Sequence, residues 1–393
     1  MVVEHEGKTY FDIPGLLFAD DLVLMARNHN DMAKLLEVTT EYGNRNKLTF
    51  NPEKSAVVIY SPHDVGRKKT LTIQGQVIPV AKNYKYLGVT LSDSRNYLNA
   101  QEEAWMKGAT SALHAMHATS LWGFNRFEIS RVQWKATAVP KLTYANSVLV
   151  RSANLRDTLD RAQRKAGKWA LGIPGSKVSN EFVEGELGWS SFEARDAQSK
   201  LRYFERVRSM PENRWPKAIL RMMELTQKET KAYQETERLR AKYECSDIRL
   251  QFDQEGRPLS NIFNKKIKER IRETQEAMWR DNMLLKTSLT TYAKGKKTRG
   301  VTSFTYDNSK GSALLALARA NMLPTRAHKM YPGTDKNLSQ GGDSQKQGTD
   351  EATQECAEFI GISKMKFGNE SPDLRSAGPE AVEIVENSGG EIY

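Results

Sequence analysis

Two adjacent carboxylates, Asp20 and Asp21, lie between the short apolar runs of residues 16–19 and 22–26. This spacing predicts a β-hairpin with the two acids at its turn. Asn-Gly or Asp-Gly suits a tight turn better, and neighbouring carboxylates repel each other unless a cation neutralises them. Mg²⁺ is such a cation, because it takes hard oxygen ligands, and a pair of Mg²⁺ ions can support nucleotidyl transfer. Alone, the dipeptide still favours a solvated turn.

The sequence after this hairpin alternates between helix and strand patterns. Apolar residues near the helical period predict a helix from Asp31 to about Asn46, with Asn30 or Asp31 as its N-cap, and Asn51-Pro52 ends it. The elements expected next are a strand over residues 56–60, a hairpin of residues 71–73 and 76–80, and a strand over residues 84–91. These elements would have to position the acids.

Beyond residue 98 the pattern becomes helical. Amphipathic helices are predicted over residues 155–170 and 194–208. Residues 217–290 are charged and helical in pattern, with few signs of a dense core. Residues 331–393 are rich in Gly, Ser, Gln and Glu, a composition that predicts disorder.

Three motifs in the first hundred residues carry a family resemblance. They are Phe18-Ala19-Asp20-Asp21 in the hairpin, Asn51-Pro52-Glu53-Lys54-Ser55 before a strand, and Tyr84-Lys85-Tyr86-Leu87-Gly88. In this order they resemble motifs C, D and E of the polymerase palm in the non-LTR (LINE-type) retrotransposon reverse transcriptases. The segments at residues 141–145, 159–172, 186–188 and 316–330 are similar to the helical regions that follow the palm, so the resemblance covers roughly residues 10–330.

The resemblance implies a role for each motif. Asp20 would be a direct ligand of the catalytic metals, with Asp21 as an adjacent acid. Lys54 would lie near the incoming triphosphate as an electrostatic stabiliser or proton donor. The primer grip, Tyr86, Leu87 and Gly88, would position the 3′ end of the DNA primer on its RNA template. Without the resemblance, Lys54 is a solvated charge and the tyrosines are ordinary strand residues.

The implied fold class is α+β. A partial palm of antiparallel hairpins plus a helix spans residues 1–98, and a helical thumb-like region spans 99–210. A helical C-terminal region follows over 211–330, and an acidic tail over 331–393.

The sequence departs from the family in the catalytic site. The family uses a further metal-binding Asp on a separate upstream strand, motif A, together with fingers and a motif B helix. Asp12 does not replace it, because a strand crossover needs a dozen or more residues before it returns alongside. We therefore expect a polymerase fragment, from an interrupted element, a downstream start codon or a longer product. It would be inactive alone and would bind Mg²⁺ only if the missing carboxylate is supplied.

No zinc site is expected. Family members often end in a Cys/His cluster, but the corresponding stretch, residues 338–343 onward, offers only Cys356, and Cys245 has no partner at ligand spacing. His114 and His117 have helical spacing without a third ligand, which favours packing or surface roles.

The charge distribution favours a polyanionic partner. The chain has 59 Lys+Arg and 48 Asp+Glu, a net +11; residues 331–393 carry 5 and 12 of these, a net −7, which leaves +18 for residues 1–330. One predicted helix carries a basic face that would track template–primer phosphates: Arg156, Arg161, Arg164, Lys165 and Lys168. Further candidates are Lys265, Lys266, Lys268, Arg270 and residues 294–299. The simpler interpretation of such faces is solvation.

No apolar run approaches the roughly 18 residues that span a bilayer, and residues 1–15 lack signal-peptide order. We expect an intracellular protein, nuclear or cytoplasmic, without a membrane partner. Three functions remain open: a reverse transcriptase fragment, a non-catalytic nucleic-acid-binding protein that uses the basic helices, and a helical interaction protein. The ordered motifs argue against the third.

Overall fold

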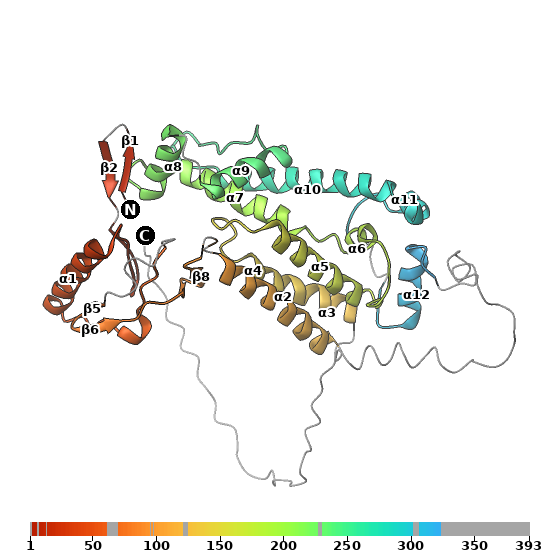
Figure 1. The fold of residues 1–393 in the computed structure, drawn as a ribbon. Coiled ribbons are helices and arrows are strands. Elements are labelled where there is room, and N and C mark those ends of the chain that lie inside the picture. The colour runs from red at the N-terminus through yellow and green to blue at the C-terminus, as the bar shows by residue number, and fades with distance from the viewer. Residues whose placement is uncertain are drawn as a thin grey trace, which may run out of the picture. The chain divides into compact units, whose positions relative to one another are not determined.

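Short antiparallel hairpins form the first part of the chain and helices form the rest (Figure 1). The computed structural model describes residues 2–5, 8–12, 14–60, 70–94, 96, 98–120, 125–226, 230–301 and 306–323. The chain divides into two units, Met1–Met330 and Tyr331–Tyr393, and all described residues belong to the first. The acidic tail and Cys356 lie outside the described residues. This architecture confirms the predicted α+β class; the finer domain boundaries stay predictions.

Each strand pairs with one neighbour, so the described strands form four two-stranded antiparallel sheets. The pairs are β1 (Val2–His5) with β2 (Lys8–Asp12), β3 (Gly15–Phe18) with β4 (Asp21–Leu24), β5 (Leu71–Ile73) with β6 (Gln76–Ile78), and β7 (Asn83–Tyr86) with β8 (Val89–Ser92). The hairpin expected around Gln74-Gly75 is confirmed. The single strand predicted over residues 84–91 is wrong, because the chain turns back at Leu87-Gly88, where both residues have a positive φ of 44° and 80°.

Helix α1 (His29–Arg45) packs on this strand region and supplies part of a small core. It begins two residues before the predicted start, because Asn28 is the cap: its Oδ1 accepts from the backbone N–H of Asp31 at 2.9 Å. The short 3₁₀ helix η1 (Pro52–Lys54) follows. The strand predicted over residues 56–60 is wrong: only Val57 pairs, through a single parallel bridge to Val80.

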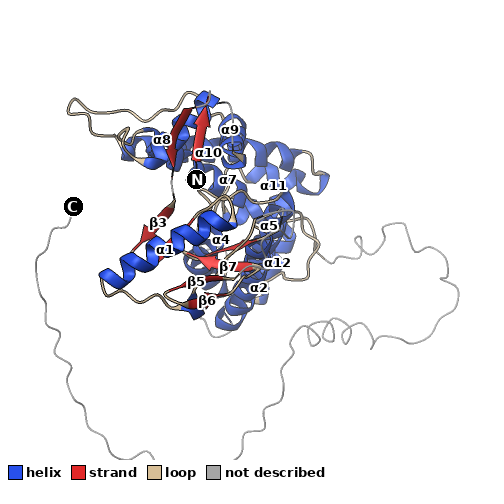
Figure 2. Cartoon of the chain, turned by 60° about the vertical axis from the view of Figure 1, so that its left-hand side comes forward, coloured by secondary structure: helices blue, strands red, loops and turns tan. Residues whose placement is uncertain are grey.

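The helical part begins at residue 99, and Figure 2 shows most of the short strands gathered beside α1, with helices making up the remainder. Its helices are α2 (Asn99–Ser120), α3 (Arg126–Gln133), the π-helix η2 (Trp134–Ala138), α4 (Val139–Thr143), α5 (Ala153–Ala170), α6 (Asn180–Leu187), α7 (Phe192–Arg208), α8 (Trp215–Thr226), α9 (Lys231–Lys242), α10 (Ser260–Leu284), η3 (Thr287–Leu289), α11 (Thr290–Gly295) and α12 (Lys310–Arg319). The helices predicted over residues 155–170 and 194–208 are confirmed by α5 and α7. No helix among the described residues has the length and apolar character to cross a membrane.

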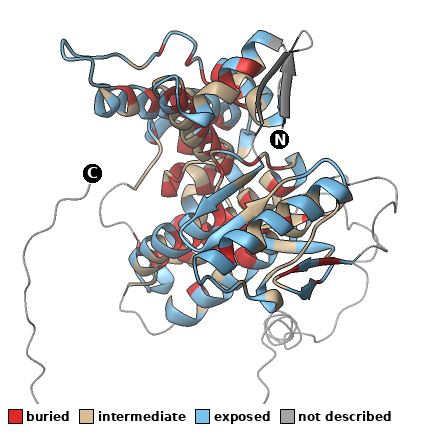
Figure 3. Cartoon of the chain, turned by 90° about the vertical axis from the view of Figure 1, so that its left-hand side faces the viewer, coloured by how far each residue is buried: buried red, intermediate tan, exposed pale blue. Residues whose placement is uncertain are grey.

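The largest core lies among helices α2 to α7, with contributions from α10 to α12. Leu142, Leu159, Ala166 and Phe182 have no exposed surface there. Figure 3 shows buried residues concentrated in these helices, whereas the strand region that faces the viewer is mostly exposed. Apolar burial is the main favourable term in folding, so most of the stability of the described chain resides in this helical core.

A second core joins α7, α9 and α10 through Leu201, Leu239 and Ile267, each fully buried. The expectation that residues 217–290 carry few signs of a dense core is therefore wrong for α9 and α10. The apolar residues of α10 recur at a helical period (Phe263, Ile267, Ile271) among many charged residues. They form a narrow buried stripe that a low average hydrophobicity does not indicate.

Glu186 is a buried carboxylate that ties distant helices together. It has no exposed surface, and it accepts from the hydroxyls of Tyr292 at 2.6 Å and Tyr306 at 2.5 Å and from Arg319 at 2.7 Å. Burial and the neighbouring Glu186 raise the pKa of both tyrosines, which keeps them protonated donors. Two segments of the family resemblance, residues 186–188 and the α12 region, meet at this contact.

Candidate nucleic-acid site

The two predicted catalytic acids lie at the tip of the β3–β4 hairpin. Phe18 pairs with Asp21, so the two-residue turn is Ala19-Asp20 and Asp21 already belongs to the strand, which corrects the predicted Asp-Asp turn. Ala19 has a φ of 52°, a left-handed conformation that costs a residue with a Cβ about 1–2 kcal/mol. Such strain often occurs at functional turns. Both carboxylates are exposed, and neither makes an ion pair with any described residue.

The hairpin that carries these acids exposes its apolar side chains. Leu17 is 73% and Phe18 is 63% exposed, and within the described strands the β3–β4 pair has no further strand at either edge. Only Leu24 at its base packs against the small core around α1. The acids therefore stand on an element whose own residues bury little apolar surface.

The described side chains do not complete a two-metal site. Among the described residues, no group of three or more His, Cys, Asp and Glu side chains is placed so that it could hold a metal ion. Asp20 and Asp21 supply two carboxylates from one hairpin, whereas a pair of catalytic metals about 3.5–4 Å apart requires ligands from more than one element. The hairpin fits one part of a Mg²⁺ site and not the whole.

Lys54 and the strand after it are joined by a specific hydrogen bond. Asn51 caps η1, because its Oδ1 accepts from the N–H groups of Glu53 at 2.9 Å and Lys54 at 3.3 Å. The hydroxyl of Tyr84, on β7, donates to the carbonyl of Lys54 at 2.6 Å. The second and third sequence motifs are therefore neighbours in space, and the exposed Lys54 side chain starts from a fixed backbone. No described hydrogen bond or ion pair joins either of them to Asp20.

The predicted primer grip forms the turn of the β7–β8 hairpin and rests against the helical body. The hydroxyl of Tyr144, just after α4, donates to the carbonyl of Leu87 at 2.6 Å. A Cβ added at Gly88 would lie 3.0 Å from the ring of Tyr144, and φ at Gly88 is +80°, so the backbone favours glycine and a side chain there would press on the tyrosine ring. A tyrosine ring thus lies close against Gly88. The N–H of Thr90 also donates to Gln101 Oε1, on α2, at 2.8 Å.

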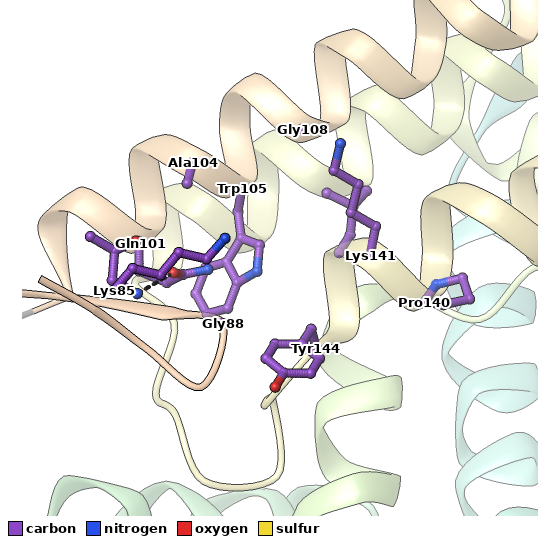
Figure 4. A pocket seen from close by; sticks show the side chains of 11 residues that line it. Lys85, Gly88, Gln101, Ala104, Trp105, Gly108, Pro140, Lys141 and Tyr144 are labelled. Atoms are coloured by element: carbon purple, nitrogen blue, oxygen red, sulfur yellow. Dashed lines mark hydrogen bonds between the residues drawn. The ribbon is translucent and has the colours of Figure 1, made fainter. Parts of the chain in front are cut away.

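A pocket of about 430 Å³ lies beside this turn, between the β7–β8 hairpin and helices α2 and α4 (Figure 4). It is lined by Lys85, Gly88 and Thr90 of the hairpin, by Gln101, Ala104, Trp105 and Gly108 of α2, and by Pro140, Lys141, Leu142 and Tyr144 of the α4 region. No local sequence pattern pointed to it. Two of the family-like segments, residues 84–88 and 141–145, meet here, and only their shared resemblance hinted that both matter.

The basic face of α5 is partly neutralised by carboxylates. Arg161 pairs with Asp157 at 3.1 Å, and Arg164 pairs with Glu184 at 3.4 Å. Surface pairs of this kind contribute about 0–1 kcal/mol, so a phosphate can replace the carboxylate at modest cost. Lys165 is exposed and has no ion pair with a described residue.

Lys168 is half-buried, and its Nζ donates to the carbonyl of Ser176 at 2.7 Å. Burial and the neighbouring Arg164 lower the pKa of Lys168. Lys168 is therefore engaged with the protein itself, as are Arg156, Arg161 and Arg164 through their carboxylate partners.

Other predicted basic residues divide in the same way. Lys265, Lys266 and Lys268 are exposed on α10. Arg270 pairs with Asp247 at 3.2 Å. In the basic stretch of residues 294–299, Lys296 is only 6% exposed.

The histidine pair on α2 does not form a metal cluster with other described residues. The ring of His117 packs against that of Trp169, with centroids 4.1 Å apart and the planes tilted by 33°. Burial and the neighbouring His114 lower the pKa of His117, so a packing role fits the geometry.

Comparison with known protein families gives a match for the first part of the chain. No curated protein and no solved structure is similar to the chain. Residues 2–91, which include Asp20, Lys54 and the Leu87-Gly88 turn, match the family model described as reverse transcriptase (RNA-dependent DNA polymerase). Enzymes of that family act on a nucleic-acid template and primer and generally use a divalent metal.

Proposed function

We propose that the chain carries the C-terminal part of the reverse transcriptase of a non-LTR (LINE-type) retrotransposon, and that it handles an RNA template paired with a DNA primer. The observation that carries the proposal is the match of residues 2–91 to the reverse transcriptase family model. Two features support it: three family-like motifs occur in order within that span, and Tyr84 links the second motif to the third.

Each predicted residue has a role in this proposal. Asp20 provides a metal ligand with Asp21 beside it, and Lys54 stabilises the triphosphate of the incoming nucleotide. Tyr86, Leu87 and Gly88 position the primer end. The duplex phosphates contact the α5 face through four cations: Arg161, Arg164, Lys165 and Lys168.

The chain alone does not polymerise in this proposal, because one hairpin with two carboxylates does not hold a metal pair. Mg²⁺ binds productively only when a further carboxylate is supplied. Primer extension on an RNA template with Mg²⁺ tests this directly, and we expect no extension. Extension by the wild-type chain that is lost in Asp20→Ala would show that the site is complete after all.

Duplex binding tests the proposal independently of catalysis. We expect the affinity for a blunt RNA–DNA duplex to decrease as the salt concentration rises from 50 to 200 mM, and to be the same for duplexes of different sequence. Replacing Arg161, Arg164 and Lys165 by Gln weakens binding and flattens the salt dependence by about one unit per lost phosphate contact. Lys286→Gln, an exposed lysine just after α10, is the control. A chain that binds no duplex at low salt would contradict the proposal.

The alternative is a non-catalytic nucleic-acid-binding protein that uses the basic helical surface. The large core, whose buried residues all lie at position 98 or beyond, favours it. In that case Tyr86→Ala leaves the duplex affinity unchanged, while the α5 substitutions abolish duplex binding. A primer-positioning role instead predicts that Tyr86→Ala binds a duplex with a recessed primer end more weakly than the wild type does.

A further inference from the structure

The pocket between the β7–β8 hairpin and helices α2 and α4 has cations at its rim. Lys85 on the hairpin and Lys141 on α4 are both exposed, and neither forms an ion pair with a described residue. The pocket lining contains no carboxylate. An opening with two unpaired ammonium groups and no acid attracts an anionic ligand.

The floor of the pocket is aromatic and offers a hydrogen-bond donor. Trp105 is only 3% exposed, and the guanidinium of Arg151 lies 4.9 Å from its ring centroid. Figure 4 shows its indole nitrogen on the side of the ring that faces Lys141 and Tyr144, and this nitrogen has no hydrogen bond to any described residue. An indole N–H that faces a pocket and has no acceptor among the described residues is available to a ligand with an acceptor atom.

The pocket is held in shape by bonds between its walls. The Tyr144 hydroxyl fixes the hairpin turn through Leu87. On the other wall Pro140 has no N–H for an α-helical bond. The chain widens there into the π-helix η2, in which the N–H of Val139 reaches the carbonyl of Trp134, five residues back. Such π segments are frequent at functional sites, and this one sets the start of α4, where Lys141 follows.

We propose that this pocket receives one unpaired base of a single-stranded nucleic acid, with Lys85 and Lys141 contacting the phosphates on either side of that base. The proposal rests on the proposed function, since it names the form of nucleic acid that this part of the chain takes. A base is flat, carries acceptor atoms and is flanked by phosphates, which matches an aromatic floor, a free indole N–H and a cationic rim. The volume is within the roughly 300–1,000 Å³ of typical small-ligand sites. A base held in a duplex is stacked and paired and does not enter.

Blocking the pocket tests the proposal. Ala104 is exposed on α2 and lines the pocket, so Ala104→Trp fills it and leaves both lysines in place. Ala118→Trp, at an exposed position of the same helix outside the pocket, is the matched control. Fluorescence anisotropy with labelled (dT)12 and (U)12 measures single-strand affinity, and a blunt RNA–DNA duplex measures general binding. We expect Ala104→Trp to lower the affinity for both single strands about tenfold. This loss is near the lower end of the range measured when the stacking of one base is removed. We expect the duplex and the control variant to stay within twofold of the wild type.

A second variant covers the case in which Ala104→Trp disturbs α2. Lys85→Gln/Lys141→Gln changes only exposed side chains and should reduce the slope of log affinity against log salt by about 1.4 for the single strands. Suppose that Ala104→Trp binds single strands as tightly as the wild type and that the salt slope of the double lysine variant is unchanged. The proposal of a base-binding pocket would then be wrong, while the proposed function would still stand. Failure of the wild-type chain to bind single strands and duplex alike would overturn both.

Discussion

The region of residues 14–98, here the hairpin region, and the helices from residue 99 onward, here the helical body, differ sharply in how they are stabilised. The hairpin region buries a cluster of Leu36, Leu71, Ile73 and Ile78, and its acid-bearing hairpin leaves Leu17 and Phe18 in solvent. The helical body buries whole faces of its helices and encloses charged pairs as well. The residues proposed for catalysis therefore lie on the less stable region, and those proposed for duplex contact on the more stable one.

The difference has a physical origin in the two kinds of element. A helix satisfies its own backbone hydrogen bonds, whereas an isolated two-stranded hairpin is marginal in water unless a further strand or a packed face supports it. The β7–β8 hairpin has such support, because Tyr144 and Gln101 bind its backbone. The described contacts give β3–β4 no comparable support from the helical body.

The largest expected effect concerns the buried charge of the helical body. Arg151 and Asp196 pair at 2.9 Å with side-chain exposures of 0% and 2%, and Asn146 also donates to Asp196 at 3.0 Å. Asp196→Ala leaves the Arg151 guanidinium buried without a counterion, which costs about 3–5 kcal/mol. Urea unfolding followed by circular dichroism measures the loss.

Asp157→Ala is the control for this prediction. Asp157 also pairs with an arginine, Arg161, but the two side chains are 62% and 56% exposed, so the change should stay within about 1 kcal/mol. Equal losses of stability in the two variants would mean that the buried Arg151–Asp196 pair stabilises the helical body no more than an exposed pair does.

The next effect separates the two regions. Leu36→Ala removes a buried side chain from the small core of the hairpin region and should cost about 2–3 kcal/mol, at the low end for Leu→Ala because a sparse cluster relaxes easily. Hydrogen exchange should show lost protection in α1 and in the β5–β6 hairpin, with α5 and α7 unaffected. Leu48→Ala, at a 49% exposed position, controls for surface change. If α5 lost as much protection as α1, the hairpin region and the helical body would unfold as one unit.

The sequence allowed the elements with strong local signals to be predicted. The β5–β6 hairpin, α1, α5 and α7 follow from turn chemistry and apolar period, and their boundaries were close. The strand predicted over residues 56–60 was wrong, because its β-branched composition favours extended backbone but, among the described residues, only Val57 pairs, through one bridge to Val80. A single strand was predicted where the chain forms the hairpin of residues 83–92, because leucine rarely adopts the positive φ that Leu87 has at the turn.

The candidate site divides along the same line. Asp20, Lys54 and the Leu87-Gly88 turn could be named from ordered motifs within one short span. The pocket could not, because Lys85 and Lys141 are 56 positions apart and meet only through packing of the hairpin on α2 and α4. The ion pair between Arg164 on α5 and Glu184 on α6 could not be predicted either, because it depends on how α6 folds back on α5.

The smallest expected effect lies at the junction of the two regions, where Tyr144 holds the β7–β8 turn. Tyr144→Phe keeps the ring against Gly88 and removes only the hydrogen bond to the Leu87 carbonyl, so the loss should be about 0.5–1.5 kcal/mol. Hydrogen exchange over residues 83–92 should quicken while α5 stays protected. Tyr42→Phe is a matched control: Tyr42 and Tyr144 are both 52% exposed, and the Tyr42 hydroxyl bonds to no described residue. If the β7–β8 backbone exchanges at the same rate in both variants, ring packing and Gln101 hold the hairpin, and Tyr144 does not couple the hairpin region to the helical body through its hydroxyl.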